Sequence, residues 1–129
     1  DKPIFVIRRS EAMLARLNEK SERLADPQSD REQQPSYAKN ETRSIRPDVA
    51  ILVGLCTHLS CSPKFRPAIT PQSFDPEWVG GFYCPCHGSK FDLAGRVYQG
   101  VPAPSNLEVP PHYYETDDVV VIGEDEGVA

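Results

Sequence analysis

Two short segments hold most of the residues of this chain that could bind a metal ion. The segments are CTHLSC at positions 56–61 and CPCHGS at positions 84–89. Together they contain all four cysteines and two of the three histidines of the 129-residue chain. Thiolate and imidazole groups are common ligands of zinc and iron, and each segment offers both. If the two segments converge in space, they could supply four ligands to one metal centre.

The spacing of these residues leaves three interpretations open. The cysteines could form two disulfides, with the histidines on the surface. Two cysteines and two histidines could hold a structural zinc ion tetrahedrally. The same residues could hold a [2Fe–2S] cluster with both histidines on one iron. Spacing alone does not choose between these interpretations, and it does not say which cysteines would be the metal ligands.

Each segment follows a predicted strand. The apolar run VAILVGL at 49–55 predicts a buried strand that leads into the first segment, and GGFYC at 80–84 predicts a strand that leads into the second. Near the start of the chain, KPIFVIRR at 2–9 predicts another strand. An amphipathic helix is expected in the following residues 10–26, with Ser10 as its cap and leucines along one stripe.

The rest of the chain predicts loops and short strands. Residues 26–47 are polar and predict a long surface excursion, and four prolines between 62 and 77 argue against regular structure there. Short strands are expected at KFD, RVY, HYYET and VVVIG, with a turn at Asp117–Asp118. We therefore expect a mostly β, antiparallel fold with one helix, forming a single domain over residues 1–129.

Charge and hydropathy exclude some kinds of partner. The net charge of −5 argues against nucleic acid or anionic lipid as the main partner, because both favour a basic surface. The longest apolar run is too short to cross a bilayer. Because the chain starts at Asp1 rather than at a methionine, we expect that a leader or membrane anchor has been removed.

The residues around the cysteines carry a resemblance to a known family. CTHLSC and CPCHGS resemble C-T-H-L-G-C and C-P-C-H-G-S, the two signature segments of the Rieske iron–sulfur proteins. GVPAPSNLEVPPHYY resembles the proline loop of that family, and FDLAGRVY its strand after the second segment. Within the family, the chain most resembles the iron–sulfur subunits of proteobacterial cytochrome bc1 (ubiquinol–cytochrome c reductase) complexes. The resemblance implies a Rieske-type antiparallel β sandwich, with a cluster-binding subdomain at about 54–105 inserted in a β base fold.

The resemblance also implies roles for individual residues. Matched position by position, Cys56 and Cys84 would ligate one iron of a [2Fe–2S] cluster, and His58 and His87 the other. The remaining pair, Cys61 and Cys86, would form a disulfide between the two segments. Such a disulfide implies an oxidising compartment, so we expect a location on the periplasmic side of the bacterial inner membrane.

The implied function is electron transfer. Two neutral imidazoles give the cluster a high reduction potential and couple electron uptake to a proton on a histidine ligand. By resemblance, His87 would contact quinol, and Ser89 would donate a hydrogen bond to the cluster. The expected partners are the cytochrome b and cytochrome c1 subunits, with cytochrome c1 as the electron acceptor. The family's N-terminal membrane helix and hinge do not occur in this sequence, so we expect the soluble head of an anchored subunit.

The chain departs from the family pattern at two positions. Ser60 stands where the first signature segment has glycine, and Phe91 stands where many relatives have a tyrosine that donates a hydrogen bond to a ligand sulfur. The missing hydroxyl at Phe91 predicts a lower reduction potential than in tyrosine-bearing relatives. Pro102 and Pro104 match the loop that shields the cluster, and Leu59 matches an exposed leucine beside it.

Other functions remain as alternatives. A Rieske oxygenase needs a second iron on two further histidines and a carboxylate, but only His112 follows the second segment. A Rieske subunit of another periplasmic oxidoreductase, such as arsenite oxidase, is the second interpretation. A zinc-binding module is the third.

Overall fold

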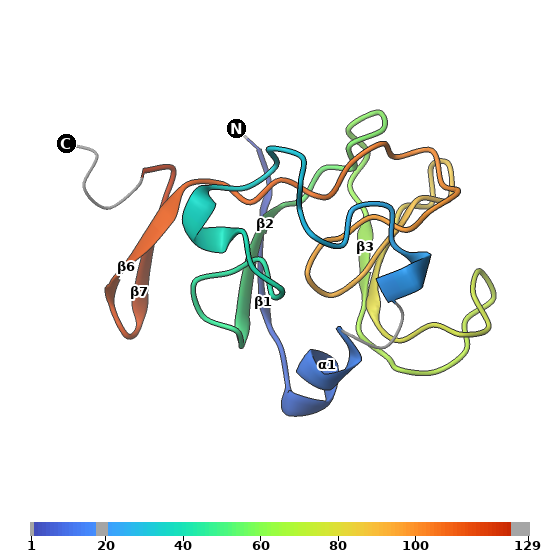
Figure 1. Ribbon diagram of the computed structural model, residues 1–129, viewed down its shortest axis with the longest axis horizontal. Coiled ribbons are helices and arrows are strands. Elements are labelled where there is room, and N and C mark those ends of the chain that lie inside the picture. Colours follow the sequence, from blue (N-terminus) through green and yellow to red (C-terminus); the bar gives the residue numbers. More distant parts are fainter. Residues whose placement is uncertain (1, 18–20, 125–129) are drawn as a thin grey trace.

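The strands form three small antiparallel groups in the computed structural model, which describes residues 2–17 and 21–124 (Figure 1). One group pairs β1 (Ile4–Arg8) with β2 (Val49–Val53). The second has the order β3 (Lys64–Arg66), β4 (Gly81–Tyr83), β5 (Lys90–Phe91). The third is the hairpin of β6 (His112–Thr116) and β7 (Val119–Ile122). The predicted mostly β, antiparallel fold with one α-helix is therefore confirmed for the described residues.

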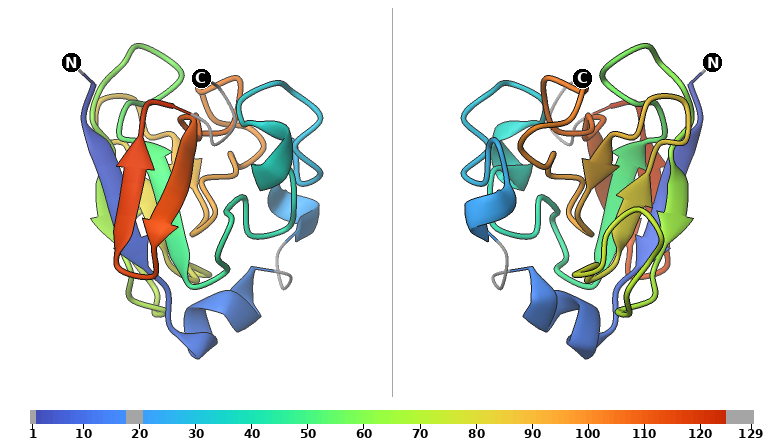
Figure 2. Two further views of the ribbon diagram at one scale, coloured as in Figure 1. Left: turned by 90° about the vertical axis from the view of Figure 1, so that its left-hand side faces the viewer. Right: turned by 90° about the vertical axis from the view of Figure 1, so that its right-hand side faces the viewer.

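These groups follow one another along the long axis of the molecule. The β6–β7 hairpin lies at one end, the β1–β2 pair in the middle and the β3–β4–β5 sheet towards the other end (Figure 1). Viewed along this axis, the segment from residue 21 to residue 48 lies on one side of the strands (Figure 2). No helix in the described part of the chain is long and apolar enough to cross a membrane.

The predicted long helix is shorter than expected. Helix α1 spans Glu11–Arg16, and the Ser10 hydroxyl caps it by accepting a hydrogen bond from the Met13 N–H at 3.2 Å. A separate 3-10 helix, η1, spans Ser21–Arg23, and residues 18–20 of the predicted helix lie outside the described residues. The leucines explain the difference, because Leu17 and Leu24 are buried in different apolar clusters instead of along one stripe.

The proline-rich stretch contains a strand that the sequence did not predict. Strand β3 lies between Pro63 and Pro67 and pairs with β4 at the edge of its sheet. Proline has no N–H for a central ladder, but it is tolerated next to a short edge strand. The predicted strand RVY, in contrast, forms only isolated bridges, between Phe91 and Val97 and between Leu24 and Tyr98.

The polar segment 26–47 runs mostly over the surface, as the sequence predicted, but it is anchored by a few buried residues. It contains the 3-10 helix η2 (Ser36–Ala38), and the side chain of Arg43 is fully buried, with 0% exposure. The Arg43 guanidinium donates hydrogen bonds to Ala94 O at 3.1 Å and to Gln34 Oε1 at 3.1 Å. A buried arginine therefore ties this segment to the chain that follows β5.

A second buried arginine ties the same segment to strand β1. The Arg9 guanidinium donates to Pro47 O at 3.0 Å, to Leu93 O at 3.0 Å and to Ser44 Oγ at 2.8 Å. Burial lowers the pKa of Arg9 to about 10 and that of Arg43 to about 10, with nearby Asp92 opposing both shifts. Both side chains therefore remain cationic at neutral pH.

The largest apolar cluster lies under the two cysteine-containing segments. The thiol-bearing residues Cys56 and Cys84 belong to this cluster together with Leu52, Phe82 and Phe91. The Phe82 ring stacks on Phe5 of β1 with a centroid distance of 5.7 Å. The core is therefore continuous with the candidate metal ligands.

We predict that Arg43→Met lowers the free energy of unfolding by about 3 kcal/mol, because it leaves several buried carbonyl groups without their charged donor. Urea denaturation of the purified protein measures the loss. Lys2→Met is the control. It removes an exposed ion pair with Glu108 (3.6 Å) and should cost less than about 1 kcal/mol. Equal losses in the two variants would contradict a structural role for Arg43.

Candidate metal centre

The first segment forms a closed loop at the end of β2. Cys56 N donates to Cys61 O at 2.6 Å, and Ser60 N donates to Cys56 O at 2.9 Å. These bonds turn the chain back on itself within six residues. The side chains of the loop therefore project from a backbone that these hydrogen bonds hold in place.

The second segment forms a similar loop between β4 and β5. Cys84 N donates to Ser89 O at 2.8 Å, and Gly88 N donates to Cys84 O at 2.9 Å. The base of the loop is closed by Tyr83 and Lys90, which face each other in the β4–β5 register. Both loops lie on the β3 side of the molecule, away from the β6–β7 hairpin (Figure 1).

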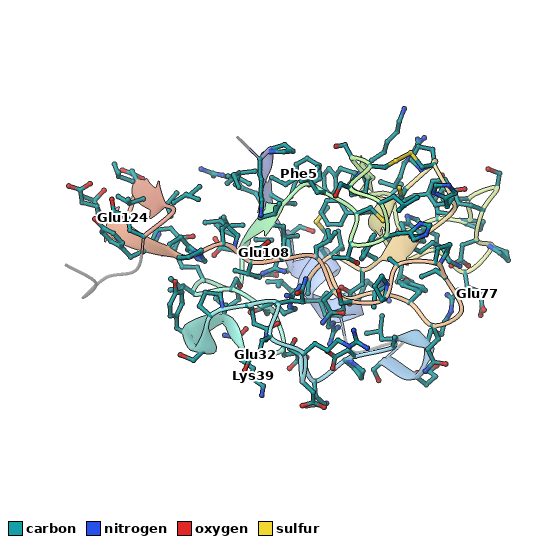
Figure 3. All side chains as sticks on the ribbon, turned by 90° about the horizontal axis from the view of Figure 1, so that it is seen from above. Phe5, Glu32, Lys39, Glu77, Glu108 and Glu124 are labelled. Atoms are coloured by element: carbon teal, nitrogen blue, oxygen red, sulfur yellow. A yellow bond between two sulfur atoms is a disulfide. The ribbon has the colours of Figure 1, made fainter. Side chains whose placement is uncertain are left out.

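A disulfide between Cys61 and Cys86 joins the two loops, with their Cα atoms 6.6 Å apart. Figure 3 shows it as a yellow bond, on the Glu77 side of the molecule and far from Glu124. This is the disulfide pairing that the family resemblance implied. It closes a loop of 25 residues. In the chain-entropy model, a link of that span is worth roughly 3 to 4 kcal/mol.

The other two cysteines are free thiols, and both are buried. The two-disulfide interpretation is therefore wrong. The sulfur atoms of Cys61, Cys84 and Cys86 lie within 4.8 Å of one another, and the disulfide leaves Cys84 as the only thiol of these three.

The environment of Cys56 favours the neutral thiol over the thiolate. Burial raises the pKa of the Cys56 thiol and neighbouring Cys84 adds to the rise, whereas hydrogen bonds from the His58 N–H and the Ser89 hydroxyl oppose it. Two buried thiolates side by side are stable only when positive charge lies beside them. A metal ion would supply that charge.

The two histidines of the segments lie next to each other. Their ring centroids are 4.8 Å apart and the rings are nearly perpendicular, at 81°. The His58 Nδ1 atom is buried and has no hydrogen-bond partner among the described residues, whereas His87 is exposed. A buried ring nitrogen without a partner is unusual in a folded protein, and metal ligation would satisfy it.

A third segment, residues 103–105, is hydrogen-bonded to both loops. The buried Ser89 hydroxyl accepts a hydrogen bond from Ala103 N at 3.0 Å, and the Thr57 hydroxyl donates to Ser105 O at 2.6 Å. Pro102 and Pro104, which flank Ala103, are exposed. No local sequence pattern indicates a role for Thr57, because its carbonyl acceptor is 48 positions away.

The tip of the first loop is exposed and apolar. The Leu59 side chain is 63% exposed, as the resemblance implied. The next residue, Ser60, has a φ of 61°, in the left-handed region that favours glycine. Glycine in the signature segment thus has a conformational reason, and this chain adopts the same backbone with serine.

The third histidine takes no part in this arrangement. His112 lies in β6, in the hairpin at the other end of the molecule (Figure 1). Its ring is buried, and its Nδ1 atom lies 2.9 Å from Pro110 O. His112 is therefore a buried strand residue away from the two loops.

Comparison with known proteins identifies the arrangement. The Rieske [2Fe-2S] domain matches residues 33–111, which is more than half of the chain and includes both loops. The chain belongs to the Rieske [2Fe-2S] domain family. A [2Fe–2S] cluster is therefore the cofactor, and zinc is not supported.

Curated relatives of this Rieske domain cover nearly all of the chain. The ubiquinol-cytochrome c reductase iron-sulfur subunit of Allochromatium vinosum is 52% identical over 128 residues, which is 99% of this chain and 62% of the relative. The Rieske subunit of the mitochondrial cytochrome b-c1 complex of Gallus gallus is 42% identical over 126 residues, which is 95% of this chain and 38% of the relative. The chain thus spans less than two thirds of these relatives.

The residues present fit such a cluster. Two buried thiols and two adjacent imidazoles give the mixed sulfur and nitrogen donor set of a Rieske centre. Within this set, the His58 Nδ1 atom has no hydrogen-bond partner among the described residues, so its lone pair is available to bind iron.

We predict that Ser60→Gly raises the free energy of unfolding by about 0.5–1 kcal/mol, because relief of the left-handed conformation exceeds the extra freedom of the unfolded chain. Thermal unfolding of the oxidised protein measures the change. The matched control is Ser62→Gly, two residues further on, where φ is not positive. That control should lose about 0.5–1 kcal/mol. A loss of stability in both variants would contradict strain at Ser60.

Proposed function

We propose that this chain is the electron-transfer head of a quinol–cytochrome c oxidoreductase. In this proposal Cys56 and Cys84 hold one iron of the [2Fe–2S] cluster, and His58 and His87 hold the other. The observations that support the proposal are two buried free thiols, two adjacent histidine rings and a disulfide that joins the two loops carrying them. The two relatives are named as subunits of ubiquinol-cytochrome c reductase and of the cytochrome b-c1 complex, and these names support the choice of reaction.

The cluster, when bound, supplies a one-electron acceptor whose two neutral ligands give it a high potential. The protein supplies the contact with substrate and the proton site. His87 is the exposed member of the histidine pair, so its outer ring nitrogen can accept a hydrogen bond from a quinol hydroxyl and hold the proton. His58, whose Nδ1 is buried, serves as a ligand.

The second role of the protein is to stabilise the added negative charge. The Ser89 hydroxyl donates to the Cys56 sulfur and accepts from Ala103 N, so its position is fixed from both sides. A hydrogen bond to a ligand sulfur stabilises the reduced, more negative state of the cluster. The exposed Leu59 at the tip of the first loop offers an apolar contact for the quinol site of a partner.

The proposed partners are the cytochrome b and cytochrome c1 subunits, with cytochrome c1 accepting the electron. The disulfide supports a location on the periplasmic side of the bacterial inner membrane, where disulfides persist. The chain would then be a redox subunit of the enzyme and, by itself, an electron carrier. Within it, residues 54–105 would be the cluster-binding subdomain of a single domain over residues 1–129.

The ligand assignment is tested by spectroscopy of the isolated protein. We predict that the dithionite-reduced protein gives a Rieske-type EPR spectrum, with iron and acid-labile sulfide in equal amounts. Cys84→Ser and His58→Ala should each lose the spectrum, because each removes a ligand. His112→Asn is the control and should keep it. A spectrum typical of four thiolate ligands, or zinc in place of iron, would reject the assignment.

The reaction is tested in the assembled complex with full-length subunit. We predict that Leu59→Asp lowers quinol-driven cytochrome c reduction about tenfold or more, because burying a charge in place of leucine at the contact costs at least 1.4 kcal/mol. Because the new carboxylate follows the proposed ligand His58 directly, it should also lower the reduction potential of the cluster, so the neutral variant Leu59→Asn is measured beside it and should lose activity at an unchanged potential. The control Val119→Asp alters a 45% exposed residue on β7, away from the loops, and should keep full activity. Full activity of Leu59→Asp would argue against quinol contact at this face.

A further inference from the structure

Residues 72–78, which we call the brace, lie between β3 and β4 and contact the base of the second loop from outside. Glu77, exposed at the surface, marks this segment in Figure 3. The brace begins with a tight turn, in which the backbones of Gln72 and Asp75 exchange hydrogen bonds of 2.9 and 3.1 Å. It ends at Trp78, which is buried and donates from Nε1 to Arg66 O at 3.0 Å. The segment thus starts with a closed turn and is tied to β3 at its end.

Two adjacent residues of the brace hold the two residues that close the second loop. The Phe74 ring stacks on the Tyr83 ring, with centroids 4.0 Å apart and an angle of 11°. The Asp75 carboxylate accepts a hydrogen bond from Lys90 Nζ at 3.3 Å. Because Tyr83 and Lys90 face each other across β4 and β5, the brace contacts both sides of the loop base.

The Asp75 carboxylate is buried and fully engaged. The residue is 2% exposed, and the same oxygen that binds Lys90 also accepts from Arg23 at 2.6 Å. Its other oxygen accepts from Glu77 N at 2.9 Å. Burial acts to raise the pKa of Asp75, but these three hydrogen bonds outweigh it and the pKa is lowered. The group is therefore an anion at neutral pH.

The second loop needs external support because its own base is short. Strand β5 has only two residues, and the β4–β5 register contains only two residue pairs. Beyond that pairing, the loop is held by the bonds from Cys84 N and Gly88 N, by the bond from Ala103 N to the Ser89 hydroxyl and by the disulfide at Cys86, and Tyr98 N donates to Lys90 O at 3.0 Å. The two residues at its base, Tyr83 and Lys90, are therefore among the few anchors on which the conformation of the loop depends.

We propose that Asp75 is a positioning residue for the second loop, acting through Lys90 to fix the backbone that carries Cys84 and His87. The inference rests on the proposed function only in taking these two residues as cluster ligands. It adds a residue outside both signature segments to the set that determines the geometry of the centre. Phe74 supports the same loop base through Tyr83.

Hydrogen exchange tests the support without any redox partner. In Asp75→Asn and in Lys90→Met, we expect the amides of Cys84 and Gly88 to exchange about ten- to a hundred-fold faster, as for the loss of a buried charged hydrogen bond. The Val53 amide, which donates to Glu108 O at 2.8 Å in another part of the fold, should keep its rate. Lys90→Arg keeps the cation, so the Cys84 and Gly88 amides should exchange about as slowly in this variant as in the unaltered protein. Unchanged exchange at Cys84 and Gly88 in both variants would overturn the proposal.

The cluster signals separate positioning from simple charge. Removing the anion in Asp75→Asn should raise the reduction potential, and removing the cation in Lys90→Met should lower it, if charge alone acts. Positioning predicts in addition that both variants change the EPR line positions of the reduced cluster, and that the double variant keeps the altered spectrum although its charge balance is restored. Opposite potential shifts with an unaltered EPR spectrum would overturn the proposal.

A control for general destabilisation is Leu17→Ala, which opens a cavity in a separate apolar cluster with Leu93 and Ala94. It should lower the unfolding temperature and leave the EPR spectrum unchanged. If Leu17→Ala alters the spectrum as Asp75→Asn does, the effect is not specific to the brace. Because neither measurement uses quinol or cytochrome, failure of the electron-transfer proposal would leave this test interpretable.

Discussion

The geometry of the metal centre depends on one covalent constraint, the disulfide between Cys61 and Cys86. The two ligand-bearing loops start from different strand groups, one from β2 and the other from β4. Each loop is closed by its own backbone hydrogen bonds, but those bonds act within one loop. The disulfide, together with the contacts of Ser89 and Thr57 to residues 103–105, converts two independent turns into one structure.

Buried charge plays the corresponding part elsewhere in the fold. Arg9 and Arg43 are completely or almost completely removed from water, and each donates to backbone carbonyls of distant segments. Asp75 is a buried anion with a similar role, because its carboxylate forms ion pairs with both Arg23 and Lys90. Short strands give little ladder energy in a chain of this size, so single charged side chains fasten the loops that the strands do not hold.

The features that sequence predicted are those encoded locally. The strands before both loops and the Ser10 cap depend on neighbouring positions, and the proposed cluster ligands rest on two short motifs. The disulfide pairing came from the family resemblance, since spacing allows either pair of cysteines. The length of α1, strand β3 and the burial of Arg43 were missed. Each depends on contacts between distant segments, as when Arg43 meets Ala94 across 51 positions.

The position of the β6–β7 hairpin has a practical consequence. Its turn, at Asp117 and Asp118, is exposed and lies at the opposite end of the long axis from the loops (Figure 1). A nitroxide attached there would lie in the same chain as a paramagnetic iron centre yet outside the ligand environment of that centre. Dipolar spectroscopy between the two spins would thus provide an internal ruler along the long axis of this chain.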